Sequence, residues 1–278
     1  MKKISRRSFM AAAAVSVAAL ALTACGGSAS SAASSVASSA ASSEAVSSAA
    51  AAELTTVEAG KLTMATNATF PPYEMTTDSG EIEGIDVDTA KAIAEKLGLE
   101  LQIDDMEFDA ALLSVQQGKA DIVMAGVTVT DERKAVMDFS DSYATGIQSI
   151  IVPNDSDIAS PDDLAGKKIG TQRGTTGYIY CSDDFGDENV VAYDSGLTAV
   201  QALNNGQVDA VVIDNAPAKE YVAANPGLVI LDTSYAEEDY AIGMAKGSAL
   251  EDAINAALEE LKADGTLQSI VDKYITAE

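Results

Sequence analysis

Residues 111–126 have the sequence ALLSVQQGKADIVMAG, and residues 199–214 repeat the pattern as AVQALNNGQVDAVVID. The two copies align without gaps, so that Gly118 matches Gly206 and an aspartate follows three positions after each glycine. Each copy begins with apolar residues at helical spacing and ends in a continuous apolar run, which is typical of a buried parallel strand. The repeat therefore predicts two similar α/β halves.

Charged residues of opposite sign follow the two copies. Arg133 lies shortly after the first copy, and Asp214 ends the second. In an open parallel sheet, ligands bind beyond the carboxyl ends of the strands. A cation from one half and an anion from the other match the carboxylate and the ammonium of a free amino acid. For Arg133 the alternatives are a solvated charge at a helix start or an ion pair with Asp131 or Glu132. For Asp214 the alternative is a helix N-cap.

Residues 1–25 have the organisation of a lipoprotein signal peptide. A basic start precedes an apolar run that is too short to span a bilayer. Residues 22–25 (LTAC) resemble the lipobox of bacterial lipoproteins, so we expect lipid attachment at Cys25. This predicts an extracytoplasmic protein, lipid-anchored to the outer face of the cell membrane. A plain secretory signal is the alternative, and Arg6-Arg7 leaves both general and twin-arginine export open.

Residues 26–53 are rich in serine and alanine and contain no hydrophobic period, which predicts a flexible linker. An alanine-rich helix is the alternative, and the serine pairs disfavour it. The folded part then comprises residues 54–278, which is enough for two lobes of about 100 residues each.

The composition excludes several kinds of function. The chain has 17 basic and 43 acidic residues, for a formal net charge of -26. Such a charge repels nucleic acid. The chain has no histidine, and Cys181 is the one cysteine left once Cys25 carries a lipid. We therefore expect no intramolecular disulfide, no metal site and no cofactor, and catalysis would lack its usual base.

The remaining pattern predicts further elements. Gly98 is placed to end one helix, while Thr130 and Ser160 are placed to begin others. Residues 174–177 (GTTG) lead into a helix whose free N–H groups could bind an anion, although an ordinary helix entry explains the glycines equally well. The main expected elements are strands at 61–66 and 99–103 and helices at 86–97, 250–261 and 267–274.

Six short motifs occur in the order in which they occur in one known family, and the match to that family extends from Leu62 to Tyr274. The chain resembles the extracellular solute-binding proteins of polar amino-acid ABC transporters. The resemblance implies an α/β type II periplasmic-binding fold, with two lobes joined by a two-strand hinge. It places lobe 1 at 54–145 and 238–278 and lobe 2 at 146–237. The motifs are TNATFPPYE (66–74), GIDVD (84–88), FDA (108–110), GVTVTDER (126–133), DFS (138–140) and ADGT (263–266).

The resemblance also implies how the ligand is held. Arg133 would bind the ligand carboxylate, together with the hydroxyl and amide of Thr128 and the amide of Thr176. Asp214 would bind the α-ammonium from the other lobe, with the carbonyl of Gly126 as a second acceptor. Closure of the lobes would exclude water and strengthen both pairs.

Four further residues would surround the ligand side chain. Phe70 and Phe108 would flank it, although their spacing alone favours core positions. Asn67 stands where many members that bind cationic side chains have aspartate, and Gln172 is also uncharged. The resemblance therefore predicts a neutral polar ligand such as glutamine.

Residues outside this set are assigned to structure. Glu74, Asp86 and Asp88 are expected to be structural, and Cys181 is expected to be an inert, partly buried thiol.

The expected function is capture of a polar amino acid and its delivery to the transmembrane subunits of an ABC permease, by a protein that is a monomer. A periplasmic-binding-fold enzyme of the dehydratase type would need a carboxylate as its base, because histidine is absent. A ligand-sensing module would need a separate signalling partner.

Overall fold

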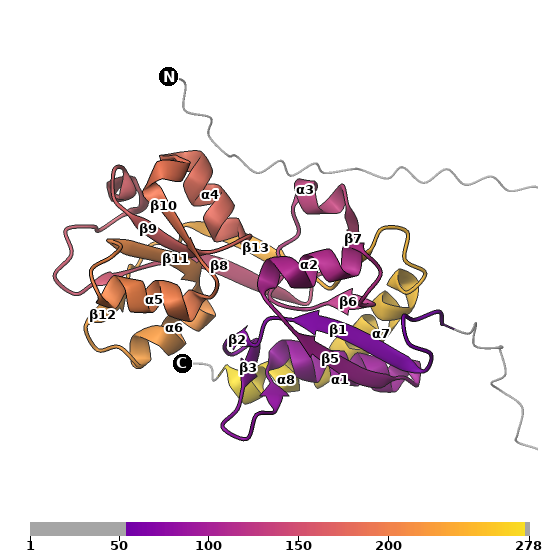
Figure 1. Cartoon of the computed structure of the whole chain (residues 1–278). Coiled ribbons are helices and arrows are strands. Elements are labelled where there is room, and N and C mark those ends of the chain that lie inside the picture. Colours follow the sequence, from indigo (N-terminus) through magenta and orange to yellow (C-terminus); the bar gives the residue numbers. More distant parts are fainter. Residues whose placement is uncertain (1–53, 276–278) are drawn as a thin grey trace, which may run out of the picture. The chain divides into compact units, whose positions relative to one another are not determined.

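The computed structural model describes residues 54–275, which form two mixed β-sheets with helices on both faces and a third, small antiparallel sheet of three short strands (Figure 1). The predicted signal peptide, Cys25 and the linker lie outside the described residues. In the first sheet β1 is parallel to β5 and β6, whereas β14 is antiparallel to β6 and β7. The strand order is β5 (Glu100–Asp105), β1 (Lys61–Thr66), β6 (Ile122–Val123), β14 (Gly243–Ala245) and β7 (Met137–Phe139).

The second sheet repeats this plan. Its strands β10, β9 and β11 are parallel, and β8 runs antiparallel to β11, β12 and β13. The strand order is β10 (Val190–Tyr193), β9 (Ile169–Gln172), β11 (Ala210–Asp214), β8 (Ala144–Pro153) and β12 (Leu228–Ile230), with β13 (Ala236–Tyr240) also paired to β8. The predicted α/β class is confirmed.

Helices cover both faces of each sheet. In the first sheet, α1 (Ile85–Leu97), α7 (Glu251–Ala263) and α8 (Thr266–Tyr274) pack together on one face, and α2 (Phe108–Gln116) covers the other. In the second sheet, α4 (Thr176–Phe185) covers one face, while α5 (Gly196–Asn204) and α6 (Asn215–Ala223) cover the opposite face.

The two repeated strands are buried on both faces, as their apolar runs predict. In β11, Val211 and Ile213 belong to the core beneath α5 and α6, while Ala210 and Val212 belong to the core beneath α4. Side chains alternate between the faces of a strand, so a strand with a core on each side must be apolar throughout. In the segment around β6, Ile122 and Met124 belong to one core cluster of the first sheet, while Val123 and Ala125 belong to the other.

The glycine and the aspartate of the repeat also have matching roles. Gly118 and Gly206 both adopt φ 66°, a left-handed conformation that glycine adopts at little cost. The carboxylate of Asp121 accepts a hydrogen bond from the backbone N–H of Thr63 at 2.8 Å. The equivalent aspartate, Asp209, accepts from the N–H of Lys168 at 2.7 Å. Each aspartate thus ties its own strand to the adjacent strand, β1 or β9.

Predicted helix ends agree with the structure. Gly98 caps α1 in the left-handed conformation, and the Thr130 hydroxyl accepts from the N–H of Arg133 at the start of α3. Ser160 begins a helix as predicted, but this helix is a 3-10 helix of only four residues. The remaining elements are β2 (Thr69–Phe70), β3 (Glu74–Thr76), β4 (Ile82–Glu83), α3 (Asp131–Lys134), η1 (Pro161–Leu164) and η2 (Asp187–Asn189).

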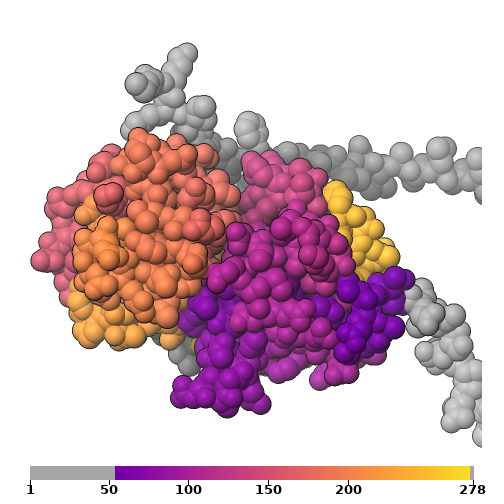
Figure 2. All heavy atoms as spheres, viewed as in Figure 1, coloured from indigo at the N-terminus to yellow at the C-terminus, as the bar shows by residue number. Residues whose placement is uncertain are grey.

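The strands β8 and β13 connect the two sheets. They pair from Ala144 with Tyr240 to Gln148 with Ala236. We call β1 to β7, β14 and their helices the first-sheet part, and β8 to β13 and their helices the second-sheet part. The predicted lobe boundaries fall within or beside these paired strands and stay a prediction. Figure 2 shows the two parts abutting on the face drawn, and no helix of residues 54–275 is long and apolar enough to cross a membrane.

Candidate functional site

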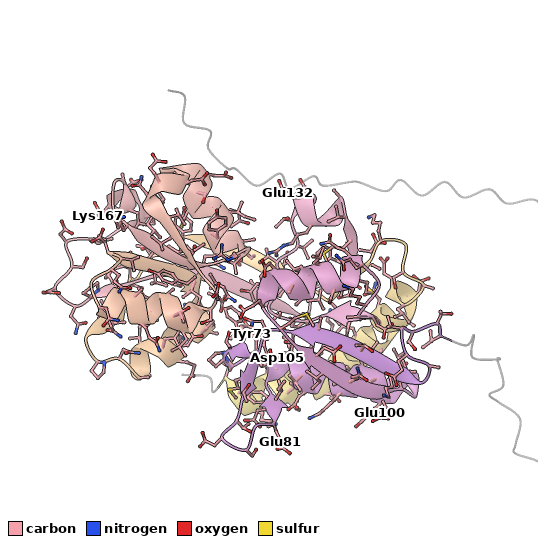
Figure 3. The ribbon with its side chains drawn as sticks, in the orientation of Figure 1. Tyr73, Glu81, Glu100, Asp105, Glu132 and Lys167 are labelled. Atoms are coloured by element: carbon pink, nitrogen blue, oxygen red, sulfur yellow. The ribbon has the colours of Figure 1, made fainter. Side chains whose placement is uncertain are left out.

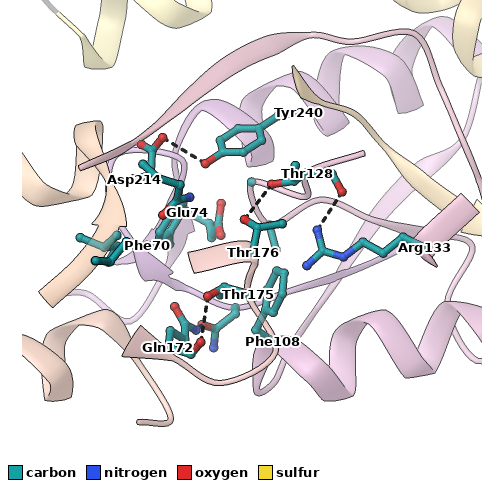
Figure 4. Close-up of a pocket in the computed structure, with 16 residues that line it drawn as sticks. Phe70, Glu74, Phe108, Thr128, Arg133, Gln172, Thr175, Thr176, Asp214 and Tyr240 are labelled. Carbon is teal, nitrogen blue, oxygen red and sulfur yellow. Dashed lines mark hydrogen bonds between the residues drawn. The ribbon is translucent and has the colours of Figure 1, made fainter. Parts of the chain in front are cut away.

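A cavity lies where the two parts meet (Figure 4). It contains about 440 Å³ of non-protein space, including its opening to solvent. Its walls include all nine positions for which the sequence predicts ligand contact. These are Asn67, Phe70, Phe108, Gly126, Thr128, Arg133, Gln172, Thr176 and Asp214. Their contact with a ligand stays a prediction.

Strand ends explain why these residues converge. Asn67 follows β1, and Gly126 follows β6 at a short distance. Gln172 and Asp214 are the last residues of β9 and β11. The carboxyl ends of the parallel strands of both sheets therefore face the same cavity. Figure 3 shows the resulting placement, with Tyr73 and Asp105 where the parts meet and Lys167 and Glu100 far from that junction.

Arg133 is buried on one side of the cavity, with 8% of its surface exposed. Its Nη1 donates to the Thr128 carbonyl at 2.7 Å, and its Nη2 donates to the Gly174 carbonyl of the second-sheet part at 3.2 Å. The guanidinium also lies 5.5 Å from the centroid of the Phe108 ring. Neither alternative fits, because the residue is not solvated and forms no ion pair within 4.0 Å among residues 54–275. Glu132 lies on the outer side of α3 (Figure 3).

Two threonine hydroxyls face each other beside Arg133. Thr128 and Thr176 are both buried, and their Oγ1 atoms are 3.4 Å apart. Thr176 is the first residue of α4, and the Thr175 hydroxyl caps this helix by accepting from the N–H of Tyr178. The first N–H groups of a helix have no partner within the helix and favour an anion. This corner of the cavity can therefore bind a carboxylate.

Asp214 lies on the opposite side of the cavity from Arg133 (Figure 4), with 2% of its surface exposed. It is the N-cap of α6, as the alternative had it, since its Oδ1 accepts from the N–H of Ala216 at 2.9 Å. Its Oδ2 accepts from the N–H of Ile147 at 2.8 Å and from the Tyr240 hydroxyl at 3.0 Å. Burial raises the pKa of Asp214 to about 6, although these hydrogen bonds oppose the shift. The same carboxylate therefore caps α6 and lines the cavity.

The two predicted amide side chains contact each other across the cavity. The Nε2 of Gln172 donates to the Oδ1 of Asn67 at 2.9 Å and thereby joins the two parts. The Nδ2 of Asn67 donates to the Met106 carbonyl at 2.8 Å, and both amides are 5% exposed. This end of the cavity thus presents uncharged donors and acceptors.

Phe70 and Phe108 both line the cavity and both pack in the core, so each combines the two roles considered for it. Phe108 lines the cavity and also belongs to the core cluster beneath α2. Phe70 lines the cavity, stacks on Tyr73 with centroids 5.7 Å apart, and packs against a core cluster of each part.

Seven further residues line the cavity, and the sequence interpretation missed them. Glu74 was assigned to structure, yet it is part of the wall and is fully buried. No amide, hydroxyl or cationic group of residues 54–275 donates a hydrogen bond to its oxygens. Burial, followed by the charge of Asp86, raises the pKa of Glu74 well above its usual range. The missed set is Glu74, Ala125, Gln148, Thr175, Val212, Ile213 and Tyr240.

Three other assignments concern residues beyond the wall. Asp86 accepts from the N–H of Gly126 at 2.9 Å, which fixes the strand end whose carbonyl is predicted to bind an ammonium. Asp88 accepts from Lys273 at 2.7 Å and from the Tyr274 hydroxyl at 2.8 Å. Cys181 is fully rather than partly buried, and burial raises the pKa of its thiol to about 12. A buried thiol of such high pKa is unreactive.

Comparison with known proteins gives a consistent result. The model of the family described as bacterial extracellular solute-binding proteins, family 3, matches residues 62–277. The L-cystine-binding protein TcyJ of Escherichia coli K12 is 32% identical over 225 residues, covering 80% of this chain and 85% of that protein. The arginine-binding extracellular protein ArtP of Bacillus subtilis is 35% identical over 228 residues, covering 78% of this chain and 87% of that protein.

Solved structures extend the likeness to three dimensions. An ancestral arginine-binding protein bound to glutamine has a TM-score of 0.75 and 42% sequence identity, and the match covers 78% of this chain and 99% of that one. The predicted type II periplasmic-binding fold is confirmed by this likeness.

Proposed function

The chain belongs to the bacterial extracellular solute-binding proteins of family 3, and on that premise we propose that it captures a free α-amino acid for an ABC importer. One observation carries the proposal: buried Arg133 and buried Asp214 lie on opposite sides of one cavity. Members of the family are binding proteins rather than enzymes, so the enzyme interpretation is dropped.

The α-carboxylate binds to Arg133 and to the N-terminus of α4, and the α-ammonium binds to Asp214 and the Gly126 carbonyl. A zwitterion supplies each buried charge with a partner of opposite sign. Because both charges are removed from water, pairing with the ligand is stronger than it would be at the surface. Residues of both parts contribute, so the ligand stabilises their contact.

A neutral polar side chain fits the remaining end of the cavity. The Asn67–Gln172 amide pair can exchange its mutual hydrogen bond for hydrogen bonds to a ligand amide. Neither amide carries a charge that would pair with a cationic ligand. A 42% identical ancestral arginine-binding protein has glutamine bound in its solved structure, which supports the view that a related cavity can accept an amide ligand.

Arginine is the second candidate. Its support is the name of the Bacillus subtilis relative and the Glu74 carboxyl in the cavity wall, which has no donor among the described residues. A cationic side chain that reached Glu74 would ionise it and pair with it. The two candidates thus differ in whether the amide pair or Glu74 contacts the ligand side chain.

A thermal-shift screen with the twenty amino acids tests the proposal. A ligand at 100 times its dissociation constant adds about 2.7 kcal/mol of stability, and for a protein of this size that raises the melting temperature by roughly 5–10 °C. We expect glutamine to give a shift of this size. A larger shift with arginine supports the second candidate, and no shift with any amino acid contradicts both.

We propose that the protein is retained at the membrane through a lipid on Cys25. This residue lies outside the described part of the chain, and the support is the sequence alone. Cys25→Ser should release the protein into the medium or periplasm without changing its ligand affinity. Retention of the variant in the membrane fraction would contradict lipid anchoring.

A further inference from the structure

A second carboxylate lies beside the corner where the ligand carboxylate is proposed to bind. Glu238 of β13 is buried, with 6% of its surface exposed. Its Oε2 accepts from the Thr128 hydroxyl at 3.0 Å and from the Nε2 of Gln148 at 3.0 Å. Its Oε1 is buried with no hydrogen-bond partner within residues 54–275. Thr128 and Gln148 both line the cavity, so Glu238 lies directly behind its wall.

The Thr128 hydroxyl has one proton and cannot donate it twice. In the structure Glu238 is its acceptor, with the Thr176 hydroxyl more distant at 3.4 Å. A ligand carboxylate bound by Arg133 would require the same proton. A carboxylate oxygen within hydrogen-bond distance of Thr128 would also lie no more than about 6 Å from Oε2 of Glu238, where like charges repel.

Glu238 also compensates the charge of Arg133. Arg133 has no ion-pair partner within 4.0 Å among residues 54–275. Burial lowers the pKa of its guanidinium, and the charge of Glu238 is the largest influence that opposes this. The two charges are linked through Thr128, whose carbonyl accepts from Arg133 and whose hydroxyl donates to Glu238.

We propose that Glu238 is a positioning residue that limits affinity: it holds the proton of Thr128 while the site is empty and competes with the ligand α-carboxylate when the site fills. The inference rests on the proposed function. It gives the protein a defined anionic competitor for Arg133, which stabilises the empty state and favours release of the ligand.

The substitution Glu238→Gln tests the proposal because it removes the charge and keeps the shape of the side chain. With the amide oxygen in the place of Oε2, the side chain still accepts from Thr128 and Gln148, but as a neutral and weaker acceptor, so a ligand carboxylate meets no like charge and competes more easily for the Thr128 proton. Titration calorimetry with glutamine and with arginine should give about tenfold tighter binding of whichever probe the wild type binds. The ligand-free melting temperature should fall. A carboxylate with a merely structural role gives weaker or unchanged binding, which overturns the proposal.

Three variants complete the binding experiment. Asp239→Asn removes an exposed charge from the adjacent position of β13, and its affinity should match that of the wild type. In a Thr128→Val background, Glu238→Gln should give a much smaller gain, since the hydroxyl proton for which Glu238 and the ligand compete is then absent. If Glu238→Gln fails to fold, Glu238→Met removes the competitor in a similar volume and should also tighten binding.

The compensation of Arg133 can be measured without a ligand. If no amino acid binds the wild type, the proposed function fails, and melting of ligand-free variants then tests the inference. Glu238→Gln should lower the melting temperature by several degrees in the wild-type background but by less than half as much in Arg133→Met, where there is no cation to compensate. Equal decreases in the two backgrounds overturn the inference.

Discussion

Among the described residues that line the cavity, Arg133 is the one cation, and it has carboxylates on two sides. Asp214 lies opposite, and Glu238 lies behind Thr128. Each of these three charged side chains already forms hydrogen bonds within the protein. The ligand must replace existing interactions, and its affinity is a difference between two sets of them.

Loss of Arg133 should abolish binding. Arg133→Met keeps most of the side-chain volume but leaves the ligand carboxylate buried without a cation, which costs at least about 100-fold in affinity. Lys134→Ala is the matched control, because it removes the neighbouring exposed cation. Titration calorimetry with the amino acid from the screen measures both. Binding by Arg133→Met within threefold of the wild type would refute its role.

Asp214 should make binding depend on pH. Burial raises its pKa to about 6 in the empty protein, and a bound ammonium favours the ionised form, so its pKa falls on binding. Affinity should therefore be full near pH 7.5 and decrease as the pH falls through 6, by up to about tenfold per pH unit. Asp214→Asn should bind weakly and lack this dependence. A wild-type affinity that is constant from pH 7.5 to 5 would contradict the assignment.

At the scale of elements, the repeat of α2–β6 in α5–β11 explains why the site lies where it does. In both copies a left-handed glycine turns the chain and an aspartate ties the new strand to its neighbour. The residues that follow each strand then emerge at the carboxyl end of a parallel sheet. Each copy of the repeat thus leads to one side of the cavity wall. The charged residue is Arg133 after the first copy and Asp214 at the end of the second.

The aspartate tie can be tested at Asp121. Its carboxylate accepts from the N–H groups of Val57 at 2.7 Å and Thr63 at 2.8 Å. Asp121→Asn replaces one acceptor oxygen with a donor, so we expect a loss of about 2 kcal/mol in the free energy of unfolding, measured by urea denaturation. Asp78→Asn, at an exposed turn, should change it by less than about 0.5 kcal/mol. Equal stability of the two variants would show that the tie contributes nothing.

The strand β8 should tolerate no side chain at Gly146. A Cβ there would lie 2.3 Å from the Cζ of Tyr240, whose hydroxyl donates to Asp214. Gly146→Ala should displace this ring and weaken ligand binding at least about tenfold. The matched control is Gly227→Ala, where a Cβ would meet no atom within 4 Å. A wild-type dissociation constant in Gly146→Ala would show that Tyr240 does not position Asp214.

At the scale of the whole described chain, hydrogen bonds join the two parts in addition to the paired strands β8 and β13. One runs from the Tyr221 hydroxyl to the Thr69 carbonyl at 2.6 Å, and others are Gln172 to Asn67 and Arg133 to Gly174. A hydrogen bond of this kind contributes about 1 kcal/mol.

Removing one of these bonds should favour separation of the parts. Tyr221→Phe should increase the radius of gyration of the ligand-free protein in small-angle X-ray scattering and weaken ligand binding by roughly fivefold. Tyr235→Phe is the control, because its hydroxyl bonds Asp184 within the second-sheet part. An unchanged radius and affinity in Tyr221→Phe would mean that this bond does not contribute to closure.

Local pattern allowed much of this fold to be predicted. The repeat, the Gly98 and Thr130 caps and the helices of residues 250–274 depend on interactions within a few positions of the chain, so their sequence signals are direct. The cavity positions after parallel strands follow from the general geometry of such sheets. Tyr240 and Gln148 carry no such signal, because they belong to strands whose pairing partners are distant in sequence.

By itself, the sequence determined the α/β class and the positions of the repeated units, since periodicity and turn residues act locally, and its family motifs pointed to nine residues that line the cavity. Only the tertiary structure decided what those residues contact. It placed Glu238 behind Thr128, brought Gln172 to Asn67 and enclosed Glu74 in the wall. Hydrogen bonds between residues far apart in the chain have no spacing rule, because they depend on where two separately folded parts meet.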